Sequence, residues 1–177
     1  METDRGRGRG EVSVVGPFWI ETSTPGRLAI LSRPRGGDWL EDEAGAWSRA
    51  GIDVVVSLLT PDEDAAFDLT GEGDACRKKG IEFRSFPILD RDVPDSRAAT
   101  AEFVANLAEQ LRLGNDVGFH CRQGVGRSAM LAAAVLVALE MEPDAAIARV
   151  ATARGLPVPE TAEQRRWITE FARPVVF

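Results

Sequence analysis

The chain has 177 residues, of which 44% are hydrophobic and 28% are charged, and this balance is typical of a soluble globular domain. That length is enough for one domain that buries its own core without disulfides or metal ions. The formal net charge of -7 argues against a general binder of nucleic acids or of anionic membranes.

Apolar runs predict the order of the strands. Residues 5–10 alternate arginine with glycine and predict a disordered basic tail over residues 1–10, whereas residues 11–177 are predicted to form one domain. Strands are predicted over residues 12–15, 28–31, 54–59, 81–88 and 117–120. The third run is nearly all apolar, as in a strand that is covered on both faces.

Helix signals fall between these runs. Asp38 and Glu41 look like a capping pair that opens a helix ending at about residue 50. Residues 60–63 form a capping box with proline in the first helical position.

The second half of the chain predicts further helices. Phe103, Leu107 and Leu111 recur every four residues as an amphipathic stripe. Residues 128–139 are apolar all round and predict a buried central helix, and two more helices are predicted over residues 144–153 and 160–171. Strands that alternate with helices indicate a single-domain α/β fold, with a mostly parallel central sheet flanked by helices and binding at the carboxyl ends of its strands.

One loop, at the end of the last predicted strand, carries the clearest chemical signal. It reads His120-Cys121-Arg122-Gln123-Gly124-Val125-Gly126-Arg127-Ser128 and leads into the apolar helix. Backbone N–H groups of a loop that opens a helix lack intrahelical partners, so they form an anion cradle that the helix dipole reinforces. The same field favours a thiolate at Cys121, which is then a nucleophile aimed at a bound phosphorus atom.

The other loop residues fit the same chemistry. The glycines let the backbone approach an oxyanion. The planar fork of Arg127 clamps two phosphoryl oxygens, and Ser128 donates its hydroxyl to the sulfur in a second step. The residues expected to bind the phosphate are Arg122, Gln123, Gly124, Val125, Gly126 and Arg127.

The full string resembles the phosphate-binding loop of the cysteine-dependent protein tyrosine phosphatase superfamily, whose pattern is His-Cys-x5-Arg followed by Ser or Thr. The resemblance extends over most of the chain, from about residue 28 to residue 171. It implies a dual-specificity phosphatase-like catalytic domain over residues 11–177, which hydrolyses phosphoric monoesters through a cysteinyl-phosphate intermediate with neither a metal nor a cofactor. It also implies that His120 structures the loop through hydrogen bonds and is not the base that deprotonates Cys121.

Residues 86–95 place three acids, Asp90, Asp92 and Asp95, on a proline-bounded loop after a predicted strand. The segment resembles the general-acid loop of dual-specificity phosphatases, particularly the group related to cyclin-dependent kinase-associated phosphatase, in which a Pro-x-x-Asp-x-x-x-Pro pattern carries the acid. That pattern makes Asp90 the acid that protonates the leaving oxygen. Asp92 is the alternative acid, and Asp95 is expected to cap the next helix.

Residues 154–164 are similar to the segment in which these phosphatases place a glutamine that orients the hydrolytic water. Gln164 matches the later of two glutamines in that pattern, and Glu160 stands where the earlier one is often found. An ordinary polar helix start is the alternative interpretation of this segment.

Substrate preference is only partly readable from the sequence. Arg122 is the only basic residue between Cys121 and Arg127, whereas phosphoinositide phosphatases of the superfamily usually place lysines there, so we expect a phosphorylated protein or peptide as the partner. The chain has no tyrosine to deepen a phosphotyrosine pocket, which favours a shallower cleft for phosphotyrosine and also for phosphoserine or phosphothreonine. An inositol phosphate substrate, and a pseudophosphatase that binds phosphoproteins without turnover, are the alternatives. Residues 33–37 either lend positive charge to the rim of the site or form a solvated turn.

The thiols bear on location and partners. Two cysteines, Cys76 and Cys121, indicate free thiols in a reducing compartment, and we expect a cytoplasmic protein without a secretory leader or membrane helix. Cys76 is expected to be a half-buried helix residue rather than a redox partner of Cys121. Because His120 is the only histidine, a zinc site of the usual ligands is not expected. No nucleic acid and no membrane are expected as partners, and the oligomeric state stays open, with a monomer favoured.

Overall fold

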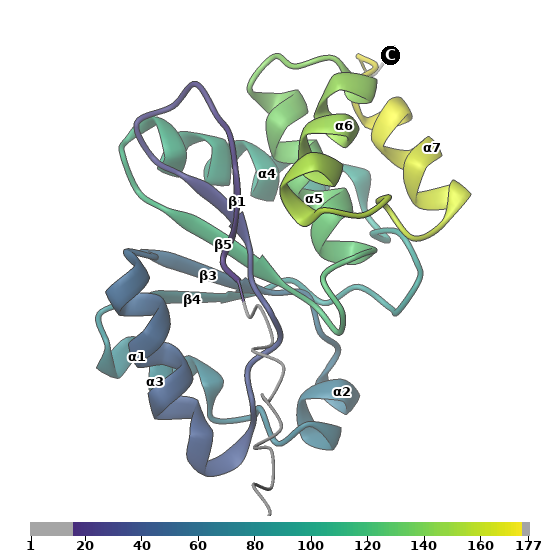
Figure 1. Cartoon of the computed structure of the whole chain (residues 1–177). Helices are drawn as coiled ribbons and strands as arrows, with labels where there is room; N and C mark the ends of the chain where they lie inside the picture. The colour runs from purple at the N-terminus through teal and green to yellow at the C-terminus, as the bar shows by residue number, and fades with distance from the viewer. Residues whose placement is uncertain (1–15, 175–177) are drawn as a thin grey trace, which may run out of the picture.

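The computed structural model describes residues 16–174. The predicted basic tail and the predicted strand over residues 12–15 lie outside the described residues. The strands are β1 (Phe18–Ile20), β2 (Leu28–Ile30), β3 (Val54–Ser57), β4 (Glu82–Ser85) and β5 (Val117–His120). They form a five-stranded sheet in the order β1-β2-β5-β3-β4 (Figure 1). β1 pairs antiparallel with β2 and the other neighbours pair in parallel, so the predicted mostly parallel sheet is confirmed.

Helices cover both faces of this sheet (Figure 1), which confirms the predicted α/β class. One face carries α1 (Leu40–Ala50) and α3 (Glu72–Lys78). The other carries α4 (Arg97–Arg112), α5 (Arg127–Ala138), α6 (Pro143–Arg154) and α7 (Ala162–Phe171). The short α2 (Pro61–Ala66) follows β3, and η1 (Gly37–Trp39), a 3-10 turn, precedes α1. Within residues 16–174, no helix has the length and apolar character needed to cross a bilayer.

The inner strands are apolar on both sides because each face of the sheet packs against helices. Val54 and Val56 of β3 belong to the core cluster that also contains the buried residues of α5, whereas Val55 belongs to the cluster shared with α1 and α3. The residues divide in this way because successive side chains of a strand point to opposite faces of the sheet. The prediction of a strand covered on both faces is confirmed for β3.

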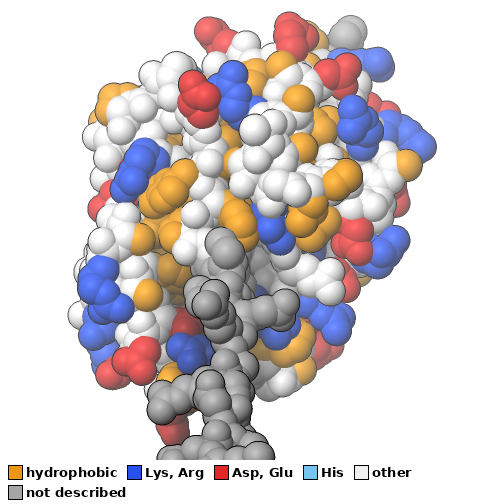
Figure 2. All heavy atoms as spheres, viewed as in Figure 1, with side chains coloured by type: hydrophobic (Ala, Val, Ile, Leu, Met, Phe, Trp, Pro, Cys, Tyr) orange, Lys and Arg blue, Asp and Glu red, His pale blue; other side chains and the backbone are white. Residues whose placement is uncertain are grey.

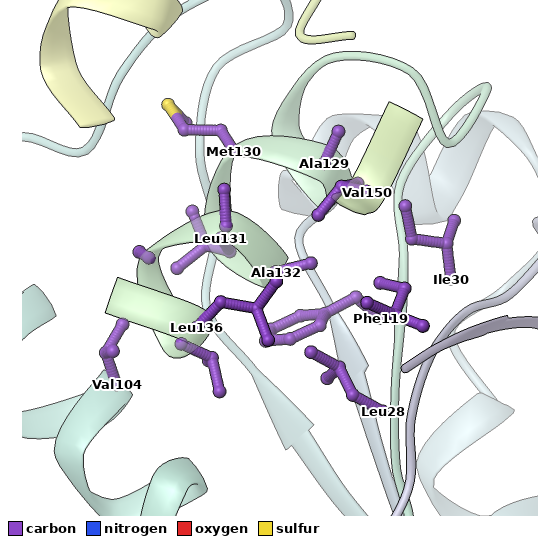
Figure 3. Packing of buried hydrophobic residues seen from close by; sticks show 14 of the residues in the cluster. Leu28, Ile30, Val104, Phe119, Ala129, Met130, Leu131, Ala132, Leu136 and Val150 are labelled. Carbon is purple, nitrogen blue, oxygen red and sulfur yellow. The ribbon is translucent and has the colours of Figure 1, made fainter. Parts of the chain in front are cut away.

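The central helix α5 is buried from its first residue through Leu136. Figure 3 shows Leu136 of this helix beside Phe119 of β5, and Leu131 of the same helix and Val104 of α4 belong to the same core cluster. Because α5 and β5 are both fixed in the core, the loop over residues 121–126 that joins them, called here the Cys121 loop, has fixed ends.

The start of α1 differs from the prediction. No side chain in the described chain caps it, so the expected capping pair of Asp38 and Glu41 is wrong. η1 occupies the place of the cap because Gly37, with φ of +60°, donates its N–H to the carbonyl of Asp68 at 2.9 Å and forms a tight turn.

The start of α4 also differs. Its cap is Ser96, whose Oγ accepts a hydrogen bond from the N–H of Ala99 at 3.1 Å, so the expected cap at Asp95 is wrong. The apolar stripe on this helix is confirmed, since Leu107 and Leu111 are fully buried in the core.

Candidate active site

A small pocket of about 60 Å³ lies where the carboxyl end of β5 meets the start of α5. Its walls come from the Cys121 loop and the start of α5, the loop after β4 and the segment before α7. The lining residues are Asp90, Cys121, Arg122, Gln123, Gly126, Arg127 and Glu160. The fold therefore brings the predicted nucleophile, the predicted arginine and the predicted acid together.

Cys121 follows β5 directly and is 3% exposed. The N–H of Gly124 donates to its Sγ at 3.3 Å. Gly124 has φ of +69°, and a Cβ there would lie 3.0 Å from Cγ2 of Ile30, so glycine is what lets the loop turn its N–H toward the sulfur. A backbone donor aimed at the sulfur is the contact that a nucleophilic thiolate needs.

The Cys121 loop is braced from α6 by Arg154, a contact that sequence reasoning misses. Nε of Arg154 donates to the carbonyl of Gly124 at 3.0 Å, and Nη2 donates to the carbonyl of Gln123 at 3.2 Å. In a trans peptide the N–H points opposite to the C=O. Because Arg154 draws these two carbonyls to its side, the N–H groups of Gly124 and Val125 point the other way, as an anion cradle requires.

Arg127, the first residue of α5, is 1% exposed, and its guanidinium has partners inside the protein. Nη1 and Nη2 each donate to a carboxylate oxygen of Glu63 at 2.8 Å, and Nη1 also donates to the carbonyl of Ile88 at 2.8 Å. Nη2 donates to Oδ1 of Asp90 at 3.2 Å. Burial alone would lower the pKa of Arg127, but the Glu63 carboxylate raises this pKa above its ordinary value, so the cation is kept.

Sequence reasoning gives Glu63 only its capping role and misses its contact with Arg127. The capping box is confirmed, since Oε2 of Glu63 accepts from the N–H of Thr60 at 2.9 Å and Oγ1 of Thr60 accepts from the N–H of Glu63 at 3.3 Å. Burial would raise the pKa of Glu63, yet the hydrogen bonds from Arg127 and Thr60 hold it below its ordinary value. The position of α2 in the chain is a signal that could have indicated this contact. α2 begins just beyond the carboxyl end of β3, at the sheet edge where β5 also ends.

Asp90 and Asp92 occupy different environments on the loop after β4. Asp90 lines the pocket, and its Oδ2 lies 3.7 Å from Nη1 of Arg122. Asp92 lies outside the pocket lining, and its Oδ1 accepts from the N–H of Val93 at 2.8 Å. Of the two acids only Asp90 lines the pocket, so Asp90 stays the predicted proton donor.

Gln164 is fully buried and acts as a brace in this structure. Its Oε1 accepts from the N–H groups of Glu160 and Thr161, each at 3.2 Å, and its Nε2 donates to the carbonyl of Asp92 at 3.1 Å. These bonds tie the start of α7 to the loop that carries Asp90. Glu160, rather than Gln164, is the side chain of this segment that lines the pocket, so a water-orienting role for Gln164 stays a prediction.

Ser128 follows Arg127 in the first turn of α5. Its hydroxyl is buried and has no hydrogen-bond partner among residues 16–174. Buried polar groups are normally paired, and the exceptions concentrate where chemistry uses them. Donation of this hydroxyl to the sulfur of Cys121 stays a prediction.

His120 is fully buried beneath the Cys121 loop and contacts Glu72 of α3. Its Nε2 lies 2.5 Å from Oε1 of Glu72, and Trp47 stacks on the imidazole with 6.0 Å between ring centroids. Burial and the Glu72 carboxylate raise the pKa of the neighbouring Asp64. Among residues 16–174 Nδ1 of His120 has no hydrogen-bond partner, so the implied role of His120 in structuring the loop stays a prediction; the partner of Nε2, Glu72, is one that sequence reasoning misses.

Glu72→Ala is expected to lower the free energy of unfolding by about 1–3 kcal/mol, because it leaves Nε2 of the buried His120 without its hydrogen-bond partner. Glu72→Gln keeps a hydrogen-bonding group beside Nε2 and is expected to cost less. Urea denaturation followed by tryptophan fluorescence measures both. The control is Glu102→Ala on the exposed side of α4, with an expected change within about 0.5 kcal/mol. Equal midpoints for Glu72→Ala and the control would show that the pair does not stabilise the fold.

Cys76 is fully buried in α3, so the predicted half-buried position is wrong. It packs into the core cluster shared by α1, α3 and the sheet, because α3 turns this side toward β3 and β4. Burial and the nearby Glu72 carboxylate raise the pKa of Cys76 to about 12. A thiol with such a pKa is unreactive near neutral pH, which supports a structural role.

Comparison with known proteins identifies relatives over most of the chain. The family model described as "Swiss Army Knife protein, DSP-PTPase phosphatase domain" matches residues 18–169. The chain is 29% identical over 124 residues to cyclin-dependent kinase inhibitor 3 of Rattus norvegicus, and 28% identical over 123 residues to the Homo sapiens protein of that name. These alignments cover 69% and 68% of this chain, and the chain spans 58% of the length of each relative.

Solved structures share the fold. The active form of Tk-PTP is 30% identical, with a TM-score of 0.69 over 83% of this chain and 92% of that chain. Kinase associated phosphatase with its catalytic cysteine replaced by serine gives 21% identity and a TM-score of 0.79, over 91% of this chain and 96% of that chain. PTPMT1 in complex with PI(5)P gives 21% identity and a TM-score of 0.70, over 87% of this chain and 94% of that chain.

Proposed function

Since the chain belongs to the DSP-PTPase phosphatase domain family of Swiss Army Knife proteins, we propose that it is a metal-independent dual-specificity protein phosphatase. It hydrolyses phosphoric monoesters through a cysteinyl-phosphate intermediate. The observation that carries the proposal is the meeting of Cys121, Arg127 and Asp90 in one pocket at the carboxyl end of β5.

In the first step the Cys121 thiolate attacks phosphorus, the sulfur–phosphorus bond forms and the bond to the leaving oxygen breaks. The N–H groups of the Cys121 loop and the guanidinium of Arg127 hold the non-bridging oxygens. Asp90, protonated, transfers its proton to the leaving oxygen, which departs as a neutral alcohol or phenol. Glu63 and the carbonyl of Ile88 hold the guanidinium through Nη1 and Nη2, so its position beside the Cys121 loop is preorganised.

In the second step water attacks the phosphorus of the cysteinyl phosphate. The Asp90 carboxylate takes a proton from this water, the sulfur–phosphorus bond breaks, and inorganic phosphate leaves. Ser128 donates its hydroxyl to the departing sulfur of Cys121. Gln164 contributes by holding the loop that carries Asp90, through its bond to the Asp92 carbonyl.

Phosphorylated protein or peptide is the proposed substrate. The pocket is small, about 60 Å³, and between Arg122 and Arg127 the loop presents only the neutral residues Gln123, Gly124, Val125 and Gly126, which suits a single phosphoryl group on any of the three hydroxyl side chains. The curated relatives carry the name of a kinase inhibitor, in keeping with a phosphoprotein partner. A reducing compartment such as the cytoplasm is part of the proposal, because the nucleophilic thiol must stay reduced.

Inositol phosphates are the second candidate substrate. The observation in their favour is the similarity of the fold to PTPMT1, which was crystallised with PI(5)P.

Purified full-length chain should hydrolyse an aryl phosphate such as p-nitrophenyl phosphate in the presence of EDTA, and should release phosphate from phosphotyrosine and phosphothreonine peptides. Initial rates with a panel of phosphopeptides and inositol phosphates rank the two substrate classes. If the chain bound phosphopeptides but did not hydrolyse them, it would be a pseudophosphatase and the proposed enzymatic function would be wrong.

Low concentrations of peroxide are expected to inactivate the enzyme, because a catalytic thiolate is oxidised first to a reversible sulfenic acid. Bound phosphate or vanadate should protect it, and a thiol reductant should restore activity. Cys76→Ser should recover like the wild-type chain, since Cys76 is buried and its high pKa disfavours reaction. Poor recovery of Cys76→Ser, together with a Cys76–Cys121 disulfide found by mass spectrometry in the wild-type chain, would assign Cys76 a redox role.

A further inference from the structure

Three segments meet beside the catalytic pocket: the loop after β2, the carboxyl end of α2 and the Cys121 loop. The guanidinium carbon of Arg33 lies 3.7 Å from the ring centroid of Phe67, in the loop after β2 and just beyond α2 respectively. The guanidinium carbon of Arg122, which lines the pocket, lies 5.8 Å from the same centroid. One aromatic ring therefore holds two cations at the edge of the site.

Few carboxylates contact these two cations directly. Among residues 16–174, no carboxylate lies within 4.0 Å of Arg33 and no hydrogen bond satisfies its guanidinium, while Arg122 has only Asp90 at 3.7 Å. Stacking on Phe67 occupies the flat face of a guanidinium and leaves its N–H donors, which lie in the plane, for other partners. Of the two alternatives for residues 33–37, the shared contact of Arg33 and Arg122 with Phe67 supports rim charge at Arg33.

Arg35, on the same loop, provides the contrast. Its guanidinium stacks on Trp39 and also pairs with Glu43 at 2.7 Å. The charge of Arg35 is thus balanced by Glu43, whereas the N–H donors of Arg33 are available to a ligand.

We propose that Arg33 and Arg122 form an anion subsite for a second acidic group on the same substrate, a carboxylate or phosphate close to the phosphorylated residue. This subsite deepens the proposed function and rests on it. An extended peptide advances about 3.3 Å per residue, so acidic side chains within about three residues of the phosphorylated one reach this rim.

A peptide suits this subsite better than a membrane lipid. The chain has a net charge of -7, and on the face seen in Figure 2 acidic and basic side chains are interspersed, which does not favour approach to an anionic bilayer. An acidic phosphopeptide meets the positive charge locally, at the two arginines beside the pocket.

The test compares two phosphotyrosine peptides that differ only in glutamate or glutamine beside the phosphorylated residue. Wild-type enzyme should prefer the glutamate peptide, and Arg33→Ala should lower kcat/KM for that peptide by about 5-fold. Activity on the glutamine peptide and on p-nitrophenyl phosphate should not change. The preference should also shrink at high salt, because exposed charges are screened.

Two further variants keep the test decisive. Arg35→Ala, which removes a neutralised arginine from the same loop, should keep the wild-type preference. Arg33→Gln retains a long side chain over Phe67 and should reproduce the loss seen with Arg33→Ala if the loss comes from charge rather than from packing.

Equal rates on both peptides in an active wild-type enzyme would overturn the subsite and leave the proposed function standing. A uniform loss on all substrates in both Arg33 variants would also overturn it. If the Arg33 variants lost activity only on inositol polyphosphates, the ligand of the subsite would be an inositol polyphosphate and not a peptide. Absence of turnover on every substrate, by contrast, would contradict the proposed function itself.

Discussion

Cys121→Ser is expected to abolish turnover while phosphate binding persists. The serine hydroxyl is a far weaker nucleophile at neutral pH than a thiolate, so the cysteinyl-phosphate step cannot proceed. The N–H groups of the Cys121 loop and the guanidinium of Arg127 are unchanged, and the latter is held by Glu63 whether or not the sulfur is present. Initial rates on p-nitrophenyl phosphate, and calorimetric titration with phosphate or vanadate, measure the two properties separately.

Cys76→Ser serves as the matched control, because it removes the other thiol from a buried helix position away from the pocket lining. It should retain activity. Wild-type activity should also survive EDTA. Substantial turnover by Cys121→Ser, or loss of wild-type activity on chelation, would point to metal-assisted hydrolysis instead of a covalent mechanism.

Asp90→Asn is expected to slow turnover by about 10²–10⁴-fold with a poor leaving group, the usual contribution of a positioned general acid. The loss should be smaller for a good leaving group, which needs no proton to depart. The measurement is the turnover rate on a series of aryl phosphates of increasing leaving-group pKa. The rate should fall more steeply with this pKa in the variant than in the wild-type enzyme.

Asp92→Asn is the control for this experiment and should slow turnover far less than Asp90→Asn. Its side chain lies outside the pocket lining and accepts a hydrogen bond from Val93, and its contact with Gln164 is made by the backbone carbonyl, which the substitution keeps. The reverse order of the two effects would move the acid from Asp90 to Asp92.

Local pattern was enough to predict much of the sheet and the loop it supports. Residues 117–120 match β5 at both ends, and the helix after the Cys121 loop is as buried as its composition indicates. β1 escapes prediction because this edge strand buries only Ile20, whereas β2, which is equally short, is buried at every residue and lies in an apolar run. The strand predicted over residues 54–59 ends at Ser57, since beyond it the chain turns toward α2.

The site was harder to predict where it depends on contacts distant in sequence. Glu63 and Arg127 are 64 residues apart, and Glu72 and His120 are 48 residues apart. Each glutamate looks like an ordinary helix residue until the fold places it beneath the pocket. The capping pattern around Glu63 is satisfied locally, so the only hint of its second role is the position of α2 just beyond the carboxyl end of β3.

Stereochemistry at phosphorus tests the covalent mechanism most directly. The substrate is a phosphate monoester made chiral with oxygen isotopes, and the acceptor is an alcohol that replaces water so that the product can be analysed. Transfer through Cys121 comprises two in-line displacements, and the expected result is retention of configuration. Inversion would show a single direct displacement on phosphorus and would contradict the cysteinyl-phosphate intermediate.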